Sequence, residues 1–461
     1  MCSLNDCSYN DNNEIHEFTK DLSTDATLCR KCRSKDIDIL LVGQSGYCNA
    51  CFLTATNHKF RAALGKSKII RHGNSVLVDY SGELNSTVLL HLIKTGMSES
   101  VHKKLIFKTV VLYIDDSTVM KETDEERCAV RSKIIEQIKD FAFTGYTVSL
   151  SEVLKKEDDV NIKLVDHDQE VDNENNDQLL TILAKLPDDT SRLDLLFQLR
   201  RKLLIVAARK LNCDKILQAD CATDVATKVL ANICLGRSAQ LSTLANFCDA
   251  RCADVKILKP MRDFTQQELL HYSEYYKIDS LKLRDLGVSG PATSIQALTQ
   301  KFTTGLESQF SGTVSVVFRT AEKLSARGNE NQDVENNCVL CDAKLDNESS
   351  DQVSAIRAIR VSRIVSSDCV LIKNLSRNME KGESNCESSQ PDDKECSANC
   401  CRSNKKKRAS SEDIQKYLCY SCRLIFRNLN IPNALPAPLL STIEQRLALR
   451  NMRREINDFL L

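Results

Sequence analysis

The 461-residue sequence has no tryptophan, few aromatic residues (5%) and no excess charge, because 63 Lys and Arg residues balance 63 Asp and Glu residues. Scarce aromatic side chains argue against base stacking as the main mode of nucleic-acid recognition. Zero net charge means that a nucleic-acid partner would need a local basic patch. We find no apolar run of about 18 residues and no charged-then-apolar leader, so we expect neither a membrane span nor a signal peptide. We therefore expect a cytoplasmic protein. Its length and its 42% share of hydrophobic residues predict a globular fold of about two or three domains.

Cysteine, in contrast, is abundant, with 21 residues. Because the cytosol keeps thiols reduced, we expect metal ligands rather than disulfides. Two Cys-x-x-Cys pairs near the N-terminus are separated by 15 residues, 33–47, a spacing at which both pairs bind one tetrahedral zinc ion. A redox dithiol is the alternative, and it is disfavoured because neither pair is expected at the start of a helix in a βαβ unit. The four predicted ligands are Cys29, Cys32, Cys48 and Cys51.

A second set of two pairs has a much longer spacing, with 77 residues, 342–418, between the pairs. Residues from about 375 to 413 are rich in Ser, Asn, Glu and Lys, which predicts a disordered insertion. The two ends of a small ribbon would then meet around one zinc ion. The predicted ligands are Cys338, Cys341, Cys419 and Cys422.

The most informative stretch is residues 76–90, which has the layout of a phosphate-binding strand, loop and helix. An apolar run before Ser81 predicts a buried parallel strand, and apolar residues recur at helical spacing after Thr87. A turn of this kind directs backbone amides toward an anion, with help from the helix dipole.

This stretch resembles the PP-loop ATP pyrophosphatases, whose motif reads Ser-Gly-Gly-x-Asp-Ser-(Ser/Thr). Glu83 stands where the second Gly belongs, and a carboxylate about 4 Å from a phosphate repels it by about 1 kcal/mol in water and about 4 kcal/mol at an effective dielectric of about 20. Leu84 replaces a lysine, and Asn85 replaces an Asp that would bind magnesium. We therefore expect a remnant that disfavours ATP, and we assign no catalytic residue. Four residues match the motif at the right spacing: Ser81, Gly82, Ser86 and Thr87.

The rest of the middle region follows an α/β pattern. Strands are predicted at 105–114, 146–148 and 215–219, the first of them ending at Asp115 and Asp116. Helices are predicted at 125–143 and 192–210 and after residue 220, whereas the acidic, Asn-rich stretch 155–177 predicts an insertion or long loop. The expected fold is a PP-loop parallel sheet flanked by helices. The expected domains are a zinc ribbon at 1–65, the degenerate PP-loop domain at 66–325 and a second Cys-rich ribbon at 326–461.

Compared with the catalytic tRNA thiolases of the PP-loop family, the chain also lacks the cysteines of the reactive sulfur centre. Those enzymes carry a Cys-x-x-Cys before an Arg-Arg helix, but here Leu193 and Leu196 take these positions before Arg200. A third cysteine of the family has no counterpart either, since no Cys occurs between Cys252 and Cys338. The resemblance therefore implies that no iron-sulfur cluster is held.

Over nearly its whole length the chain resembles the cytoplasmic tRNA 2-thiolation protein 2 family. The resemblance rests on the N-terminal cysteines, the altered loop at Ser81 and four further segments, 235–237, 314–324, 419–422 and 458–461. It implies an accessory subunit that forms a heterodimer with the catalytic tRNA thiolase. Such a complex would thiolate wobble uridine 34 in tRNAs for Lys, Glu and Gln, with sulfur from a ubiquitin-related sulfur carrier.

Two alternatives stay open from the residues alone: an ATP-dependent tRNA sulfurtransferase in its own right, and a zinc-stabilised interaction scaffold. A basic strip after the first cysteines is placed to neutralise tRNA phosphates, although its spacing also fits an ordinary solvated face. The strip consists of Lys59, Arg61, Lys66, Lys68 and Arg71.

Overall fold

The computed structural model describes most of the chain between residues 28 and 460, and every structural statement below concerns these residues alone. The acidic and cysteine-containing stretch before residue 28 and most of the predicted insertion at 375–413 lie outside the described residues. The described ranges are 28–41, 46–98, 104–120, 123–166, 173–281, 294–310, 312–324, 337–345, 410–427, 429 and 435–460.

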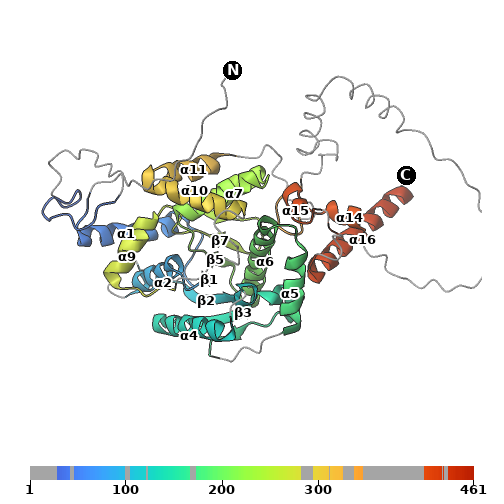
Figure 1. Ribbon diagram of the computed structural model, residues 1–461, viewed down its shortest axis with the longest axis horizontal. Coiled ribbons are helices and arrows are strands. Elements are labelled where there is room, and N and C mark those ends of the chain that lie inside the picture. Colours follow the sequence, from blue (N-terminus) through green and yellow to red (C-terminus); the bar gives the residue numbers. More distant parts are fainter. Residues whose placement is uncertain are drawn as a thin grey trace, which may run out of the picture.

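A seven-stranded sheet forms the centre of the molecule, in the order β4-β3-β2-β1-β5-β7-β6 (Figure 1). The five inner strands run parallel, and the two edge strands pair antiparallel. The predicted α/β class with a parallel sheet is therefore confirmed. The strands are β1 (Ser75–Tyr80), β2 (Lys108–Asp115), β3 (Thr144–Ser149), β4 (Lys163–Leu164), β5 (Lys215–Leu217), β6 (Cys248–Asp249) and β7 (Lys256–Leu258).

Helices cover both faces of the sheet, which explains why its inner strands are almost continuously apolar. In β1, Leu77 packs on one side with the leucines of α5 and α6, whereas Val76 and Val78 pack on the other side with α1, α2, α4 and α9. Figure 1 shows α6 and α2 on either side of the strands. The bounds are α1 (Asn49–Ser67), α2 (Leu84–Met97), α4 (Asp124–Phe141), α5 (Asn173–Lys185), α6 (Asp189–Lys210) and α9 (Gln266–Tyr276).

A third apolar cluster lies beyond the sheet and joins α7, α8 and α11. α10 also packs against α7 (Figure 1). Phe318 of α11 is fully buried among Val225, Val229 and Leu241. The bounds are α7 (Ala222–Cys234), α8 (Leu241–Ala245), α10 (Ile295–Gln309) and α11 (Thr313–Lys323).

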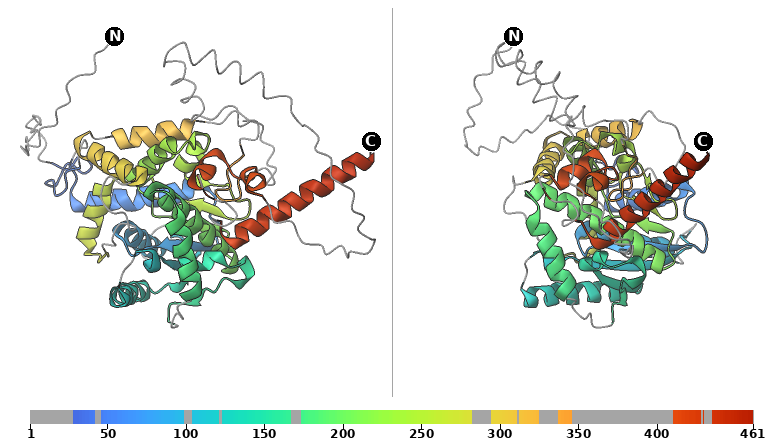
Figure 2. Two further views of the ribbon diagram at one scale, coloured as in Figure 1. Left: turned by 45° about the vertical axis from the view of Figure 1, so that its right-hand side comes forward. Right: turned by 90° about the vertical axis from the view of Figure 1, so that its right-hand side faces the viewer.

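The C-terminal helices pack against the α6 side of the sheet through residues such as Ile425 and Ile443. The last part of the long helix α16 projects away from the body (Figure 2). None of the helices within the described ranges has the length and hydropathy of a transmembrane helix. The remaining elements are α3 (Ser117–Met120), η1 (Leu150–Leu154), η2 (Glu157–Asp159), η3 (Ser238–Gln240), α14 (Ser411–Gln415), α15 (Tyr420–Ile425) and α16 (Ala437–Leu460).

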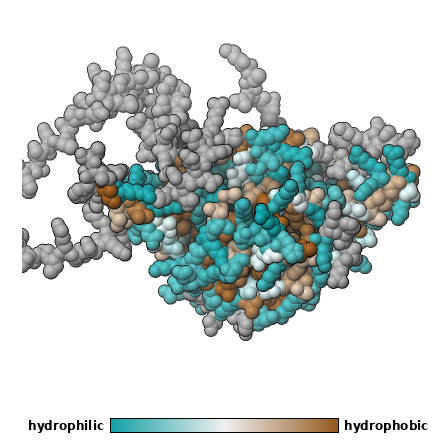
Figure 3. Space-filling view, turned by 180° about the vertical axis from the view of Figure 1, so that it is seen from behind, coloured by the Kyte–Doolittle hydropathy of each residue, from teal (hydrophilic) through white to brown (hydrophobic). Residues whose placement is uncertain are grey.

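The acidic stretch 155–177 differs from the expected loop. Its described part contains η2, the edge strand β4 and the first residues of α5, and Val160 and Val165 are buried in the two main cores. These two valines flank β4, whose own two residues are not buried, so the acidic composition gives little sign of a strand. Apolar contacts also cross the predicted boundary near residue 65, because Phe52 and Phe60 of α1 share one core with β1. The face seen from behind is mostly hydrophilic, with apolar residues scattered over it (Figure 3).

Candidate metal centres and nucleotide-loop remnant

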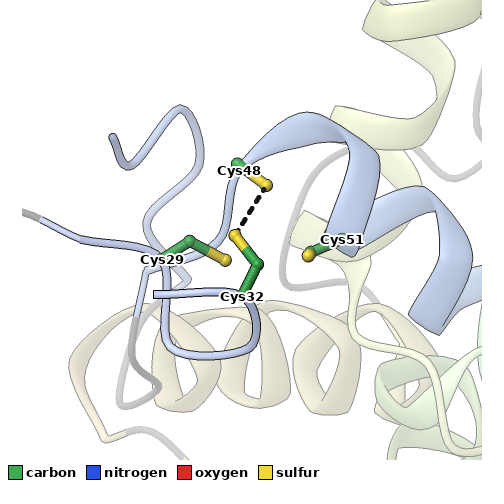
Figure 4. Close-up of side chains that lie close together, drawn as sticks. All are labelled: Cys29, Cys32, Cys48 and Cys51. Atoms are coloured by element: carbon green, nitrogen blue, oxygen red, sulfur yellow. Dashed lines mark hydrogen bonds between the residues drawn. The ribbon is translucent and has the colours of Figure 1, made fainter. Parts of the chain in front are cut away.

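The N-terminal cysteines come together in space. The Sγ atoms of Cys29, Cys32, Cys48 and Cys51 all lie within 4.8 Å of one another, and Cys32 Sγ is 3.8 Å from Cys48 Sγ (Figure 4). Cys29 and Cys48 are buried, whereas Cys32 is exposed. The group can hold one metal ion.

Local structure explains how these pairs are presented. The first pair lies in a turn whose ends are joined by an isolated antiparallel bridge between Leu28 and Asp36. The segment between the two pairs forms a bridge between Ile39 and Tyr47, and residues 42–45 lie outside the described residues. Cys48 is the N-cap of α1. The second pair therefore opens a helix, but α1 precedes β1 and is not the crossover helix of a βαβ unit, so this does not contradict our expectation.

The second group of cysteines is assembled despite the long gap in sequence. Cys338, Cys341, Cys419 and Cys422 are all buried, and their Sγ atoms lie within 4.8 Å of one another. Cys341 Sγ is 3.6 Å from Cys419 Sγ. Cys419 is the N-cap of α15, so this pair also opens a helix. The ends of the predicted insertion thus meet at one site that can hold a metal ion.

Two side chains from the α/β core reach the sulfur atoms of this second group. Arg237 Nη2 lies 3.6 Å from Cys422 Sγ, and Gln240 Nε2 lies 3.7 Å from Cys341 Sγ. Such donors stabilise the negative charge of thiolates around a metal. Gly236 makes this approach possible, because it has a φ of 80° and an added Cβ would lie 3.2 Å from the ring of Tyr420.

Arg237 is itself held by a buried ion pair that our reading of the sequence did not identify. Asp194 of α6 accepts two hydrogen bonds from the guanidinium, at 2.8 and 2.6 Å, and the two side chains are only 2% and 5% exposed. The available signal was an Asp among leucines on the apolar face of a helix, since Leu193, Leu195 and Leu196 surround it. This pair links the second cysteine group to the middle of the molecule.

The four residues that match the PP-loop motif come together between β1 and α2, but they bond to one another. Ser81 N donates to Ser86 Oγ at 3.3 Å, and Ser86 Oγ donates to Glu83 O at 2.9 Å. Thr87 Oγ1 donates to the carbonyls of Gly82 and Glu83, at 3.2 and 2.9 Å. Gly82 has a φ of 81°, which the turn requires. The loop therefore closes with its own hydrogen bonds.

Asn85 has a specific hydrogen-bond partner in α7. Its amide donates to Asp224 Oδ2 at 2.9 Å, and Gln266 Nε2 donates to Asn85 Oδ1 at 3.3 Å. Burial raises the pKa of Asp224, which also accepts a hydrogen bond from the backbone of Cys221. An Asp at position 85 would place a second carboxylate against Asp224, so the change from Asp to Asn suits this arrangement.

Ion pairs fill the carboxyl edge of the sheet beside the loop. Arg200 of α6 contacts Asp79 at 3.2 Å and Asp116 at 3.1 Å, across the ends of β1 and β2. The pKa of Asp116 is raised above its usual value, because the effect of burial outweighs the opposing effect of the Arg200 guanidinium. Lys228 binds Asp220 at 2.7 Å. Carboxylates thus outnumber cations around the remnant, which disfavours a phosphate group.

The predicted basic strip is only partly available for a ligand. Lys59 Nζ lies 2.8 Å from Glu268 Oε2 and 4.6 Å from the centre of the Phe264 ring, so its charge joins α1 to α9. Arg61 Nε donates to the carbonyl of Asn57 at 3.4 Å. The other three members, Lys66, Lys68 and Arg71, are exposed.

One family model and one solved structure are similar to parts of the chain. The family model for cytoplasmic tRNA 2-thiolation protein 2 matches residues 294–424, which contain the second cysteine group. The solved structure of the U34-tRNA thiolase NcsA from Methanococcus maripaludis with its 4Fe-4S cluster is similar at a TM-score of 0.49 and 19% identity, covering 64% of this chain and 87% of that chain.

Curated relatives match over most of their length. Cytoplasmic tRNA 2-thiolation protein 2 of Xenopus tropicalis is 28% identical over 97% of this chain and 96% of the relative. The protein of the same name from Drosophila willistoni is 30% identical over 83% of this chain and 94% of the relative. The chain therefore belongs to the cytoplasmic tRNA 2-thiolation protein 2 family.

Proposed function

We propose that this chain is the non-catalytic subunit of a cytoplasmic complex that thiolates wobble uridine 34 of tRNAs for Lys, Glu and Gln. Family membership supports the link to tRNA 2-thiolation. The observation that carries the non-catalytic role is the occupied carboxyl edge, where Arg200 bridges Asp79 and Asp116 and the loop at Ser81 bonds to itself.

In this proposal a catalytic thiolase binds the chain as a heterodimer and activates the uridine C2 oxygen with ATP. A sulfur nucleophile, supplied through a ubiquitin-related sulfur carrier, then displaces AMP. This chain contributes a binding surface and no reacting group. A paralogue that keeps the fold can keep the surface of an ancestral dimer after losing its active site.

We further propose that each cysteine group binds zinc. Four thiolates about 2.3 Å from one ion in a tetrahedron lie about 3.8 Å apart. One Sγ–Sγ distance in each group is close to this value, 3.8 Å between Cys32 and Cys48 and 3.6 Å between Cys341 and Cys419, and all the others lie within 4.8 Å. A 4Fe-4S cluster binds each thiolate to a different iron atom, so its sulfur atoms would lie farther apart. Zinc would hold each ribbon in shape rather than take part in sulfur transfer.

The test is binding by the purified chain, alone and with its catalytic partner, with metal content measured on the same sample. We expect zinc without iron, no ATP binding by the chain alone, and tRNA binding by the mixture. Release of pyrophosphate by the chain alone in the presence of tRNA would instead identify an independent sulfurtransferase. A chain that binds neither tRNA nor the thiolase would be a scaffold of another kind.

A further inference from the structure

The amino-terminal edge of the sheet, opposite the nucleotide-loop remnant, has a distinct charge. β1 and β2 run parallel, with Ser75 opposite Lys108 at one end and Tyr80 opposite Tyr113 at the other. At about 3.3 Å per residue, a six-residue strand separates these ends by roughly 17 to 20 Å. The two edges of the sheet are therefore independent surfaces.

Two segments form the part of this edge at the starts of β1 and β2, and neither contains an acidic residue. Asp214 and Asp254, at the neighbouring starts of β5 and β7, are paired with Lys215 and Arg209. Residues 58–78 lead into β1, residues 104–114 form the start and body of β2, and Asp and Glu are absent from both. The exposed cations in these segments are Lys66, Lys68, Arg71, Lys104 and Lys108, which we call the basic edge.

Backbone hydrogen bonds hold the two segments side by side. Lys108 N donates to Asn74 O at 2.8 Å, and Gly73 N donates to Ile106 O at 3.4 Å. Asn74 Oδ1 also accepts from Arg71 N at 2.7 Å, which fixes the turn before β1. The basic edge is therefore presented by ordered backbone at the start of two central strands.

The charges of the basic edge are not neutralised within the part of the chain that the structure describes. None of its five side chains forms an ion pair there, in contrast to Lys59 with Glu268 and to Lys215, which pairs with Asp214 at the start of β5. At the opposite edge, Arg200 and Lys228 are both bound to carboxylates. Unpaired Lys and Arg side chains on one surface attract phosphate groups.

We propose that the basic edge binds the phosphate backbone of RNA. It lies at the amino-terminal edge of the sheet, opposite the carboxyl edge that carries the remnant of the nucleotide site. This inference rests on the proposed function, because it identifies where that RNA would lie. The contacts are to phosphates and carry no base specificity, as expected for flexible Lys and Arg side chains. A non-catalytic subunit can bind RNA away from its own remnant, because the reacting uridine belongs in the partner.

The test compares two charge-reversed forms of the full chain, each studied alone and with the catalytic thiolase. The first carries Lys68→Glu, Arg71→Glu, Lys104→Glu and Lys108→Glu. The matched control carries the same change in charge at four exposed lysines elsewhere, Lys133→Glu, Lys156→Glu, Lys301→Glu and Lys323→Glu. Circular dichroism and metal content establish that both are folded, and the probe is an unmodified tRNA transcript in a salt series.

We expect the first form to lose about tenfold or more in affinity, with a slope of log affinity against log salt that is shallower by about 3. The control should stay within about twofold of the unaltered chain. Equal losses of affinity in both forms, or no loss in either, would refute RNA binding by the basic edge while leaving tRNA binding and the proposed function intact. Loss of thiolase binding with unchanged RNA binding would instead assign the edge to an acidic protein surface. Absence of tRNA binding by the unaltered complex would refute both proposals.

Discussion

At the scale of single residues, the buried pair between Asp194 and Arg237 connects the second cysteine group to α6. Removing one member leaves an unpaired buried charge, so Asp194→Asn should lower the free energy of unfolding by about 3 to 5 kcal/mol. Asp189→Asn is the control, because its ion pair with Arg192 is partly exposed and should contribute less than about 1 kcal/mol. Urea denaturation measures both. Equal effects would show that burial of the pair has no energetic consequence.

A second residue, Asp249, makes stability depend on pH. Burial raises its pKa, but the Arg251 guanidinium outweighs burial and holds the pKa well below its usual value. A lowered pKa in the folded state contributes stability above the unfolded pKa of about 3.9, and this contribution is lost as the pH falls through the folded pKa. Asp249→Asn should therefore be destabilising at pH 7, and its difference from the unaltered chain should shrink below about pH 4. Denaturation across that range is the measurement, and a constant difference would contradict the assignment.

At the scale of elements, the altered loop between β1 and α2 is fitted to α7 through Asn85 and Asp224. Restoring the motif with Asn85→Asp places two carboxylates together, so we expect stability to fall by about 1 to 3 kcal/mol. We expect no gain of ATP binding, because Arg200 still pairs with Asp79 and Asp116. Thermal unfolding and calorimetric titration with ATP test this pair of outcomes. Saturable ATP binding by the variant would mean that one residue had inactivated the loop.

The main elements could be predicted from sequence because their periodicity is strong. The apolar run before Ser81 is β1, and the amphipathic stretch 192–210 is α6, which begins slightly earlier at Asp189 after the N-cap Asp188. The edge strand β4 could not be predicted, since two residues carry too little pattern. Nor could the pairing of Arg237 with Asp194, because it depends on how α6 and the end of α7 meet in space. Cysteine spacing, however, was enough to nominate the first group, and spacing together with the polar composition of residues 375–413 nominated the second.

At the scale of the whole molecule, the two cysteine groups differ in how deeply they are embedded. All four cysteines of the second group are buried in the core that contains α6, whereas Cys32 of the first group is exposed. Cys422→Ser should therefore lower the melting temperature of the whole chain, by roughly 1 °C for each kcal/mol lost, because an unfolding entropy of about 2.1 cal/mol/K per residue sums to about 1 kcal/mol/K in a chain of this length. Cys32→Ser should remove bound metal with a smaller shift. Calorimetry with metal analysis measures both shifts in melting temperature. A larger shift for Cys32→Ser than for Cys422→Ser would contradict the deeper embedding of the second group.

We infer that the molecule has kept the PP-loop architecture without nucleotide chemistry, because its carboxyl edge is occupied by its own ion pairs. The most direct test is equilibrium binding of ATP with magnesium to the purified chain alone, followed by an assay for pyrophosphate release when tRNA is added. We expect no saturable binding at millimolar ATP and no release of pyrophosphate. Saturable binding together with tRNA-dependent release of pyrophosphate would contradict this inference and identify the chain as an enzyme in its own right.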